Sequence, residues 1–158
     1  MDGLQPPFSG ALVVIMSIDR KQMEIGLKSQ VIPTLRKLGF KGSFPNLYRE
    51  VNDFVSLINF QFFSSGGSLC INLSYADPER DNIFHKKDTE PKKLKVMHTR
   101  EQVRLGANNL EGDHWFSFGK TNYNEYRGEA IPLEQLTIEI NQLIQSQAEE
   151  WWSEKCSG

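Results

Sequence analysis

The sequence predicts an α+β fold in which an antiparallel sheet of about four to five strands is built on a central hairpin. Two observations carry this prediction. Residues 54–75 alternate apolar and polar side chains on either side of a glycine-containing turn, which is typical of two paired strands. A long segment near each end of the chain repeats apolar residues at helical spacing, so two long helices are expected to pack on one face of the sheet.

The sequence of the hairpin predicts the register of its two arms, because both arms alternate apolar and polar side chains and only a matched pairing puts the apolar ones on the same face. Pairing the arms around the turn places Phe60 opposite Ile71. Asn59 then lies opposite Asn72, and every apolar side chain falls on one face while every amide falls on the other. The apolar positions are Ile58, Phe60, Phe62, Leu69, Ile71, Leu73 and Tyr75, and the polar ones are Asn59, Gln61, Cys70, Asn72 and Ser74.

The first helix is expected from about Asp19 to Leu38, with Ser17 as its cap. Pro33 should bend it, because proline has no N–H to donate to the preceding turn. Gly39 ends the helix, since glycine readily adopts the left-handed conformation that follows a last turn. Residues 46–51 then form a short strand that leads into the hairpin.

The second half of the chain is less regular. Residues 76–98 are polar, basic in their second half and without periodicity, so we expect a mobile excursion. Residues 96–105 and 114–118 are expected to return as short strands. The last helix should run from about residue 133 to 152, with Trp151 on its apolar face. Trp152 is expected at the edge of that face, where it could anchor a partner or a dimer mate, or merely cap the core.

Length and composition favour one domain. The 158 residues suffice for a single core, which we place in residues 16–158. Two interpretations of residues 1–15 stay open, a disordered extension or an additional edge strand. Their apolar run is too short for a membrane span and lacks the flanks of a signal peptide. Two cysteines without CxxC spacing favour a reducing, cytoplasmic setting, and no membrane association is expected.

Several short motifs, taken in order, resemble a known family. They are Leu38-Gly39-Phe40, Tyr48-Arg49, Ile58-Asn59-Phe60-Gln61, Ile71-Asn72-Leu73, Arg104-Leu105-Gly106 and Gly112-Asp113-His114-Trp115. Their order, over residues 16–152, resembles the small bacterial domains known as domain of unknown function 4304. Trp115-Phe116 stands where the resemblance implies paired tryptophans. The resemblance implies a compact α+β fold and brings no activity with it.

Two sets of residues are candidates for a site. The amides of the hairpin, with Arg49 expected nearby, supply directional donors and acceptors that suit recognition more than bond breaking. The second set surrounds Asp113, where arginines could hold an anion and an imidazole could act as a base. Sequence neighbours on a strand face opposite ways, which argues against Asp113 steering His114. The candidates are Arg49, Asn59, Gln61 and Asn72 in the first set, and Arg100, Arg104, His114 and Trp115 in the second.

The leading hypothesis is a non-catalytic binding module of a bacterial cytoplasm that meets a protein or small-molecule partner through the polar sheet face. An immunity or accessory protein is one form of it, and a homodimer stays open. The alternative is a hydrolase or nuclease that acts on a phosphorylated substrate through His114 and the arginines. No cofactor or metal is expected, because glycine-rich phosphate loops are absent and the three histidines lack ligand spacing. The net charge of −2 makes nucleic acid an unexpected partner.

Overall fold

The computed structural model describes residues 18–80, 82–83 and 90–157, and it confirms the α+β prediction. The expectations for residues 1–15 and for a cap at Ser17 lie outside the described residues. The strands are β1 (Lys41–Ser43), β2 (Asn46–Val51), β3 (Phe54–Phe62), β4 (Ser68–Ala76), β5 (Val103–Arg104) and β6 (Phe116–Ser117). The helical segments are α2 (Arg20–Gln30), α3 (Ile32–Lys37), η1 (Pro91–Lys93), η2 (Val96–His98), η3 (Asn108–Leu110), α4 (Leu133–Leu143), η4 (Ile144–Ala148) and α5 (Glu149–Ser157).

The sheet is antiparallel, in the order β1-β2-β3-β4-β5, and β6 also pairs with β4. The predicted hairpin register is confirmed, because Phe60 pairs with Ile71 and Asn59 with Asn72. Gly66 and Gly67 make the turn with φ angles of 87° and 86°, which residues with a Cβ rarely adopt. The strand expected over residues 46–51 is also confirmed.

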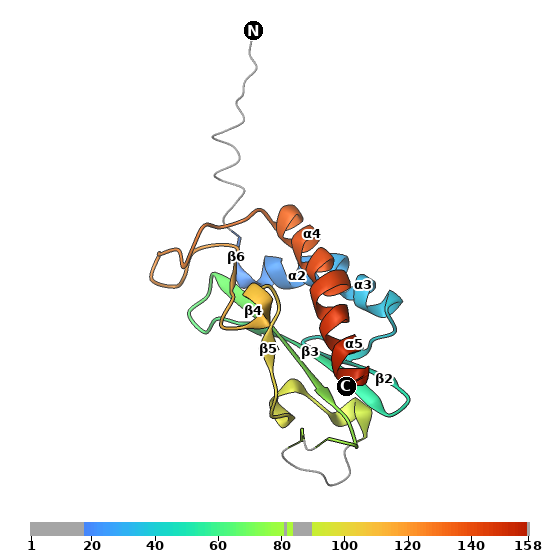
Figure 1. The fold of residues 1–158 in the computed structure, drawn as a ribbon. Helices are drawn as coiled ribbons and strands as arrows, with labels where there is room; N and C mark the ends of the chain where they lie inside the picture. Colours follow the sequence, from blue (N-terminus) through green and yellow to red (C-terminus); the bar gives the residue numbers. More distant parts are fainter. Residues whose placement is uncertain (1–17, 81, 84–89, 158) are drawn as a thin grey trace.

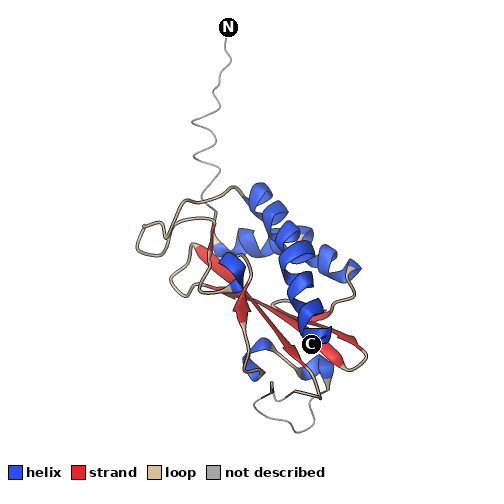
Figure 2. Ribbon diagram, viewed as in Figure 1, coloured by secondary structure: helices blue, strands red, loops and turns tan. Residues whose placement is uncertain are grey.

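Helices α2 to α5 lie on one face of the sheet and form the main core with it (Figures 1 and 2). Each helix contributes side chains that are excluded from solvent, among them Leu27, Leu35, Ile140 and Trp152. Helices α2 and α4 lie side by side, and the Asn141 side chain donates to the carbonyl of the last residue of α2 at 2.9 Å. None of the helices in the described ranges has both the length and the apolar character that crossing a bilayer requires.

The first predicted helix is in fact two helices. Asp19, expected in the first turn, is the cap itself: its carboxylate accepts from the Gln22 N–H at 2.8 Å, and the Gln22 side chain accepts from the Asp19 N–H at 3.0 Å. The chain then breaks at Val31, and Pro33 lies in the first turn of α3, where a missing N–H costs little.

The C-terminal helix contains a π-turn, η4, between α4 and α5. In a regular α-helix successive residues are about 100° apart, so a stripe of residues spaced by four drifts around the helix. A π-turn holds one extra residue and turns the following residues back. Both Trp151 and Trp152 are therefore buried, and the expectation that Trp152 lies at an exposed edge is wrong. The buried stripe is Leu136, Ile140, Ile144, Ala148 and Trp152.

The second face of the sheet carries a smaller core at one end. Leu94 follows the short helix η1, and Val96 is the first residue of η2. Both side chains are buried there against Val55, Leu57 and Ala76. The expectation of a mobile excursion is therefore wrong for residues 90–98, while residues 84–89 lie outside the described range. The strands expected over residues 96–105 and 114–118 shrink to the two-residue β5 and β6.

A polar network ties the end of α5 to the sheet. The Glu101 carboxylate accepts from the Tyr75 hydroxyl at 2.7 Å and pairs with Lys155 at 2.6 Å. Burial alone would raise the pKa of Glu101, but hydrogen bonds from Lys155 and Tyr75 outweigh it and hold the pKa below its ordinary value of 4.5.

This network predicts part of the acid sensitivity of the fold. Because the pKa of Glu101 is lower in the folded chain than in the unfolded one, the stability that it contributes is present above pH 4.5 and is lost as the pH falls through the folded-state pKa. Urea unfolding between pH 3 and pH 6 should show a steeper loss of unfolding free energy in the wild type than in Glu101→Gln. If the unfolding free energies of the two proteins fell equally steeply with pH, the stabilising role given to the Glu101 carboxylate would be wrong.

Candidate functional site

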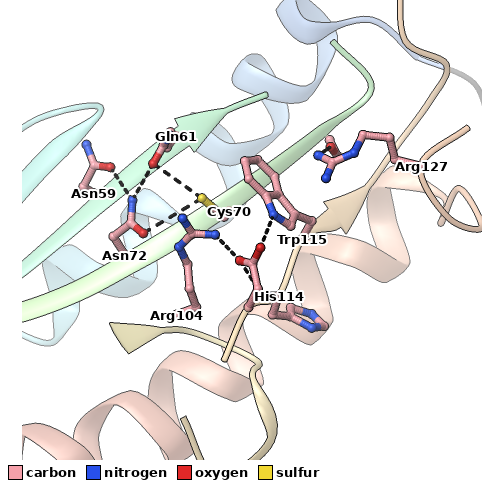
Figure 3. A network of polar contacts seen from close by, with 10 residues as sticks. Asn59, Gln61, Cys70, Asn72, Arg104, His114, Trp115 and Arg127 are labelled. Carbon is pink, nitrogen blue, oxygen red and sulfur yellow. Dashed lines mark hydrogen bonds and ion pairs between the residues drawn. The ribbon is translucent and has the colours of Figure 1, made fainter. Parts of the chain in front are cut away.

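An amide ladder crosses three strands on the second face of the sheet, at the end away from the smaller core. It consists of Asn46 on β2, Asn59 and Gln61 on β3, and Asn72 on β4. The Asn59 amide donates to Asn46 at 2.9 Å. The Asn72 amide donates to Asn59 at 2.9 Å and to Gln61 at 3.0 Å (Figure 3). The register brings these side chains together, since Asn59 is the cross-strand partner of both other asparagines.

The ladder leaves hydrogen-bond donors for an outside partner. Asn72 is buried, whereas Gln61 is exposed. The Gln61 carbonyl accepts from Asn72 and, at 3.6 Å, from the Cys70 thiol, so its NH₂ group is free to face solvent. Burial raises the pKa of the Cys70 thiol, which the charge of Arg104 opposes only in part, so this sulfur stays protonated and is a poor nucleophile.

An arginine–aromatic cluster adjoins the ladder. It consists of Phe63, Arg104, Asp113, Trp115 and Arg127. The indole of Trp115 lies between the two guanidinium groups, which are 5.2 Å and 4.7 Å from its centroid (Figure 3). Phe63 meets Trp115 edge to face at 5.6 Å, an arrangement that aromatic quadrupoles favour.

Strand pairing positions this cluster. Arg104 is the cross-strand partner of Asn72, so its side chain shares the face of the ladder. On β6, Phe116 is the partner of Leu69, which packs in the main core. Trp115 therefore faces the other way, toward the ladder, because neighbouring residues on a strand alternate. A shallow hollow lined by Asn72, Arg104 and Asp113, among others, lies between the ladder and the cluster.

Asp113 organises the cluster electrostatically. Its carboxylate accepts from the Trp115 indole N–H at 3.0 Å and from the His114 backbone N–H at 3.0 Å, and it pairs with Arg104. The indole hydrogen bond and the charge of Arg104 lower the pKa of Asp113. The carboxylate therefore stays ionised at neutral pH and neutralises one of the two arginines of the cluster.

The remaining predicted site residues, Arg49, His114 and Arg100, are not part of the amide ladder or the arginine–aromatic cluster. Arg49 was expected near the amides, and this is wrong: its side chain lies on the helix-covered face, where it pairs with Glu149 at 2.7 Å. The His114 ring points away from the cluster and packs edge to face on Phe116 at 4.7 Å (Figure 3). Arg100 is exposed, and its backbone N–H donates to the carbonyl of Asn82 at 3.1 Å.

Sequence reasoning missed two residues of the cluster. Phe63 could have been found, because it continues the alternation of Asn59 and Gln61 and so falls on their face. Arg127 could not, since it lies in an irregular loop between β6 and α4 where no periodicity fixes its direction.

In the comparison with family models, residues 31–154 match the family described as "Domain of unknown function (DUF4304)". The chain belongs to this family. The DUF4304 match begins at the break between α2 and α3, and it contains the whole amide ladder and the whole arginine–aromatic cluster. Neither the curated proteins nor the solved structures that were compared with this DUF4304 chain contain a match.

Proposed function

We propose that the chain is a non-catalytic binding module that meets a protein partner through the amide ladder and the arginine–aromatic cluster. The amide ladder carries this proposal, because its amides satisfy one another within the sheet and still present the Gln61 donors outward. Tryptophan and arginine beside it are the residue types that most often supply binding energy at protein interfaces.

The geometry favours this function over a hydrolase or nuclease. The enzymatic alternative needs an imidazole and arginines that converge on one bound substrate. Arg104 lies on the ladder side, whereas the His114 ring packs on Phe116. The hollow beside Asn72 is shallow and open, as suits a surface that another protein covers.

A cytoplasmic protein that blocks a partner by covering it, such as a bacterial immunity or accessory protein, is the concrete form of this proposal. Such a function requires a rigid surface and no active site. Cys70 and Cys156 are both free thiols, one buried and one exposed, which supports a reducing compartment.

Site-specific photo-crosslinking in the native host tests the proposal. A photoreactive residue in place of exposed Gln61 should form an adduct with one partner protein. The same residue in place of Ile138, which is 53% exposed on α4, is the control and should not. Absence of a Gln61 adduct, or the same adducts from both positions, would refute the proposed binding face.

A further inference from the structure

Arg127 is held in a fixed position although it comes from a loop. Its guanidinium lies 3.9 Å from the centroid of Phe63 and 4.7 Å from that of Trp115, and it donates to the Ser68 hydroxyl at 3.4 Å. Stacking of this kind reduces the freedom that a long side chain would lose on binding. The chain therefore presents a pre-organised cation on the ladder face.

Within the part of the chain that the structure describes, Arg127 has no ion-pair partner, and the charge of Asp113 offsets its charge only in part, from a longer distance. Asp113 pairs with Arg104, and no described carboxylate lies within ion-pair distance of Arg127. The cluster thus carries two guanidinium groups and one carboxylate. The hydroxyl of Ser68 takes one of the five N–H donors of Arg127, and the planar guanidinium matches the two oxygens of a carboxylate.

We infer that the partner presents an acidic segment to this surface, with an aspartate or glutamate carboxylate on Arg127 and a carbonyl group on the Gln61 amide. The inference rests on the proposed function and specifies its partner chemistry. Two exposed aromatic side chains, Tyr123 (72%) and Tyr126 (48%), lie in the same loop as Arg127. This loop, orange in Figure 1, projects beside β6.

Nucleic acid fits this surface less well than an acidic protein segment. Proteins that bind single strands stack bases on open aromatic faces, and here the Trp115 indole lies between two guanidinium groups (Figure 3). The net charge of the whole chain, −2, adds no long-range attraction for phosphates.

An NMR titration of the whole chain tests the charge preference directly. The probe is end-blocked tetraglutamate, and end-blocked tetraglutamine is the uncharged control. Tetraglutamate should shift the Arg127 Nε–Hε, Trp115 indole and Gln61 amide signals, while tetraglutamine should not. Arg127→Gln should weaken tetraglutamate binding about tenfold.

Arg20→Gln is the matched variant, because Arg20 also stacks on an aromatic ring, Phe62, but on the helix-covered side of the sheet. It removes the same charge and should leave the affinity unchanged. An equal loss of tetraglutamate affinity in both variants would show that the effect comes from the overall charge of the chain, and it would overturn the inference. Stronger shifts of the same signals with a single-stranded DNA octamer would overturn it in favour of nucleic acid.

The Gln61 crosslink separates this inference from the proposed function. If the adduct forms, the crosslinked peptide of the partner should contain aspartate or glutamate, and Arg127→Gln should lower the yield of the adduct. An adduct with a non-acidic peptide and an unchanged yield would overturn the acidic partner and leave the binding face standing. Failure to form any Gln61 adduct would refute both the acidic partner and the proposed binding face.

Discussion

Replacement of Trp152 by alanine is expected to lower the free energy of unfolding by about 3 to 5 kcal/mol, the range for truncating a large buried aromatic side chain. Trp152 is 1% exposed and packs on Phe40 with ring centroids 5.1 Å apart. Its indole N–H also donates to the Ser74 carbonyl at 2.9 Å, so the truncation also removes a buried hydrogen bond.

Chemical denaturation followed by circular dichroism measures this loss. Ile138→Ala on α4 is the control and should change stability by less than about 1 kcal/mol, because that side chain is already half exposed. A loss below about 1 kcal/mol for Trp152→Ala would contradict the burial of this residue by the π-turn.

Arg49→Ala is expected to cost about 2 to 3 kcal/mol, somewhat less than the loss of one partner from a fully buried ion pair. The Arg49 and Glu149 side chains are 17% and 28% exposed and pair through both carboxylate oxygens, at 2.7 and 3.0 Å. The guanidinium also stacks on Phe40 at 4.6 Å and donates to the Leu38 carbonyl at 3.1 Å. The truncation therefore removes a link between β2, α5 and the end of α3.

A double-mutant cycle with Glu149→Gln separates the ion pair from the stacking. The coupling free energy should be about 1 to 2 kcal/mol, as for other contacting charged pairs. Additive losses would show that the pair contributes little and that Arg49 acts through its ring contacts. Below the unfolding transition, the Arg49→Ala variant should keep the Gln61 crosslink, since Arg49 lies on the opposite face of the sheet.

The hairpin could be predicted in detail because three independent signals agree on it. The alternation of both arms, the two glycines between them and the matched amides all specify one register, and a shift by one residue would bury Asn59 in the main core. The family could likewise be predicted, because most of the short motifs that indicate it lie in or beside the strands of the sheet.

The placement of Arg49 was also within reach of sequence reasoning. Leu47 pairs with Ile58 in the main core, so Arg49, two residues further along the same strand, must share its face. The residue type of Arg49 suits a polar site, whereas the alternation along β2 places it on the helix-covered face. An arginine on a helix-covered face is uncommon, but here Glu149 neutralises it.

Other features, one of the fold and one of the site, depend on contacts that the sequence does not specify. Leu94 and Val96 are isolated apolar residues in a basic stretch, and only their position over Val55 and Leu57 explains their burial. Arg127 gains its fixed direction from Phe63 and Trp115, which are far from it in sequence.

The π-turn also bears on how a change of length in the C-terminal helix would act on the residues beyond it. Gln147 lies in the π-turn, and its side chain fixes the segment that follows β5. The side-chain oxygen accepts from the Gly106 N–H at 2.6 Å, and the side-chain NH₂ group donates to the Ala107 carbonyl at 3.0 Å. Loss of one residue from η4 would remove the extra residue and restore a regular helix, so the residues beyond it would keep their orientation. A relative with a single-residue gap there should therefore keep a large aromatic residue at the position aligned with Trp152.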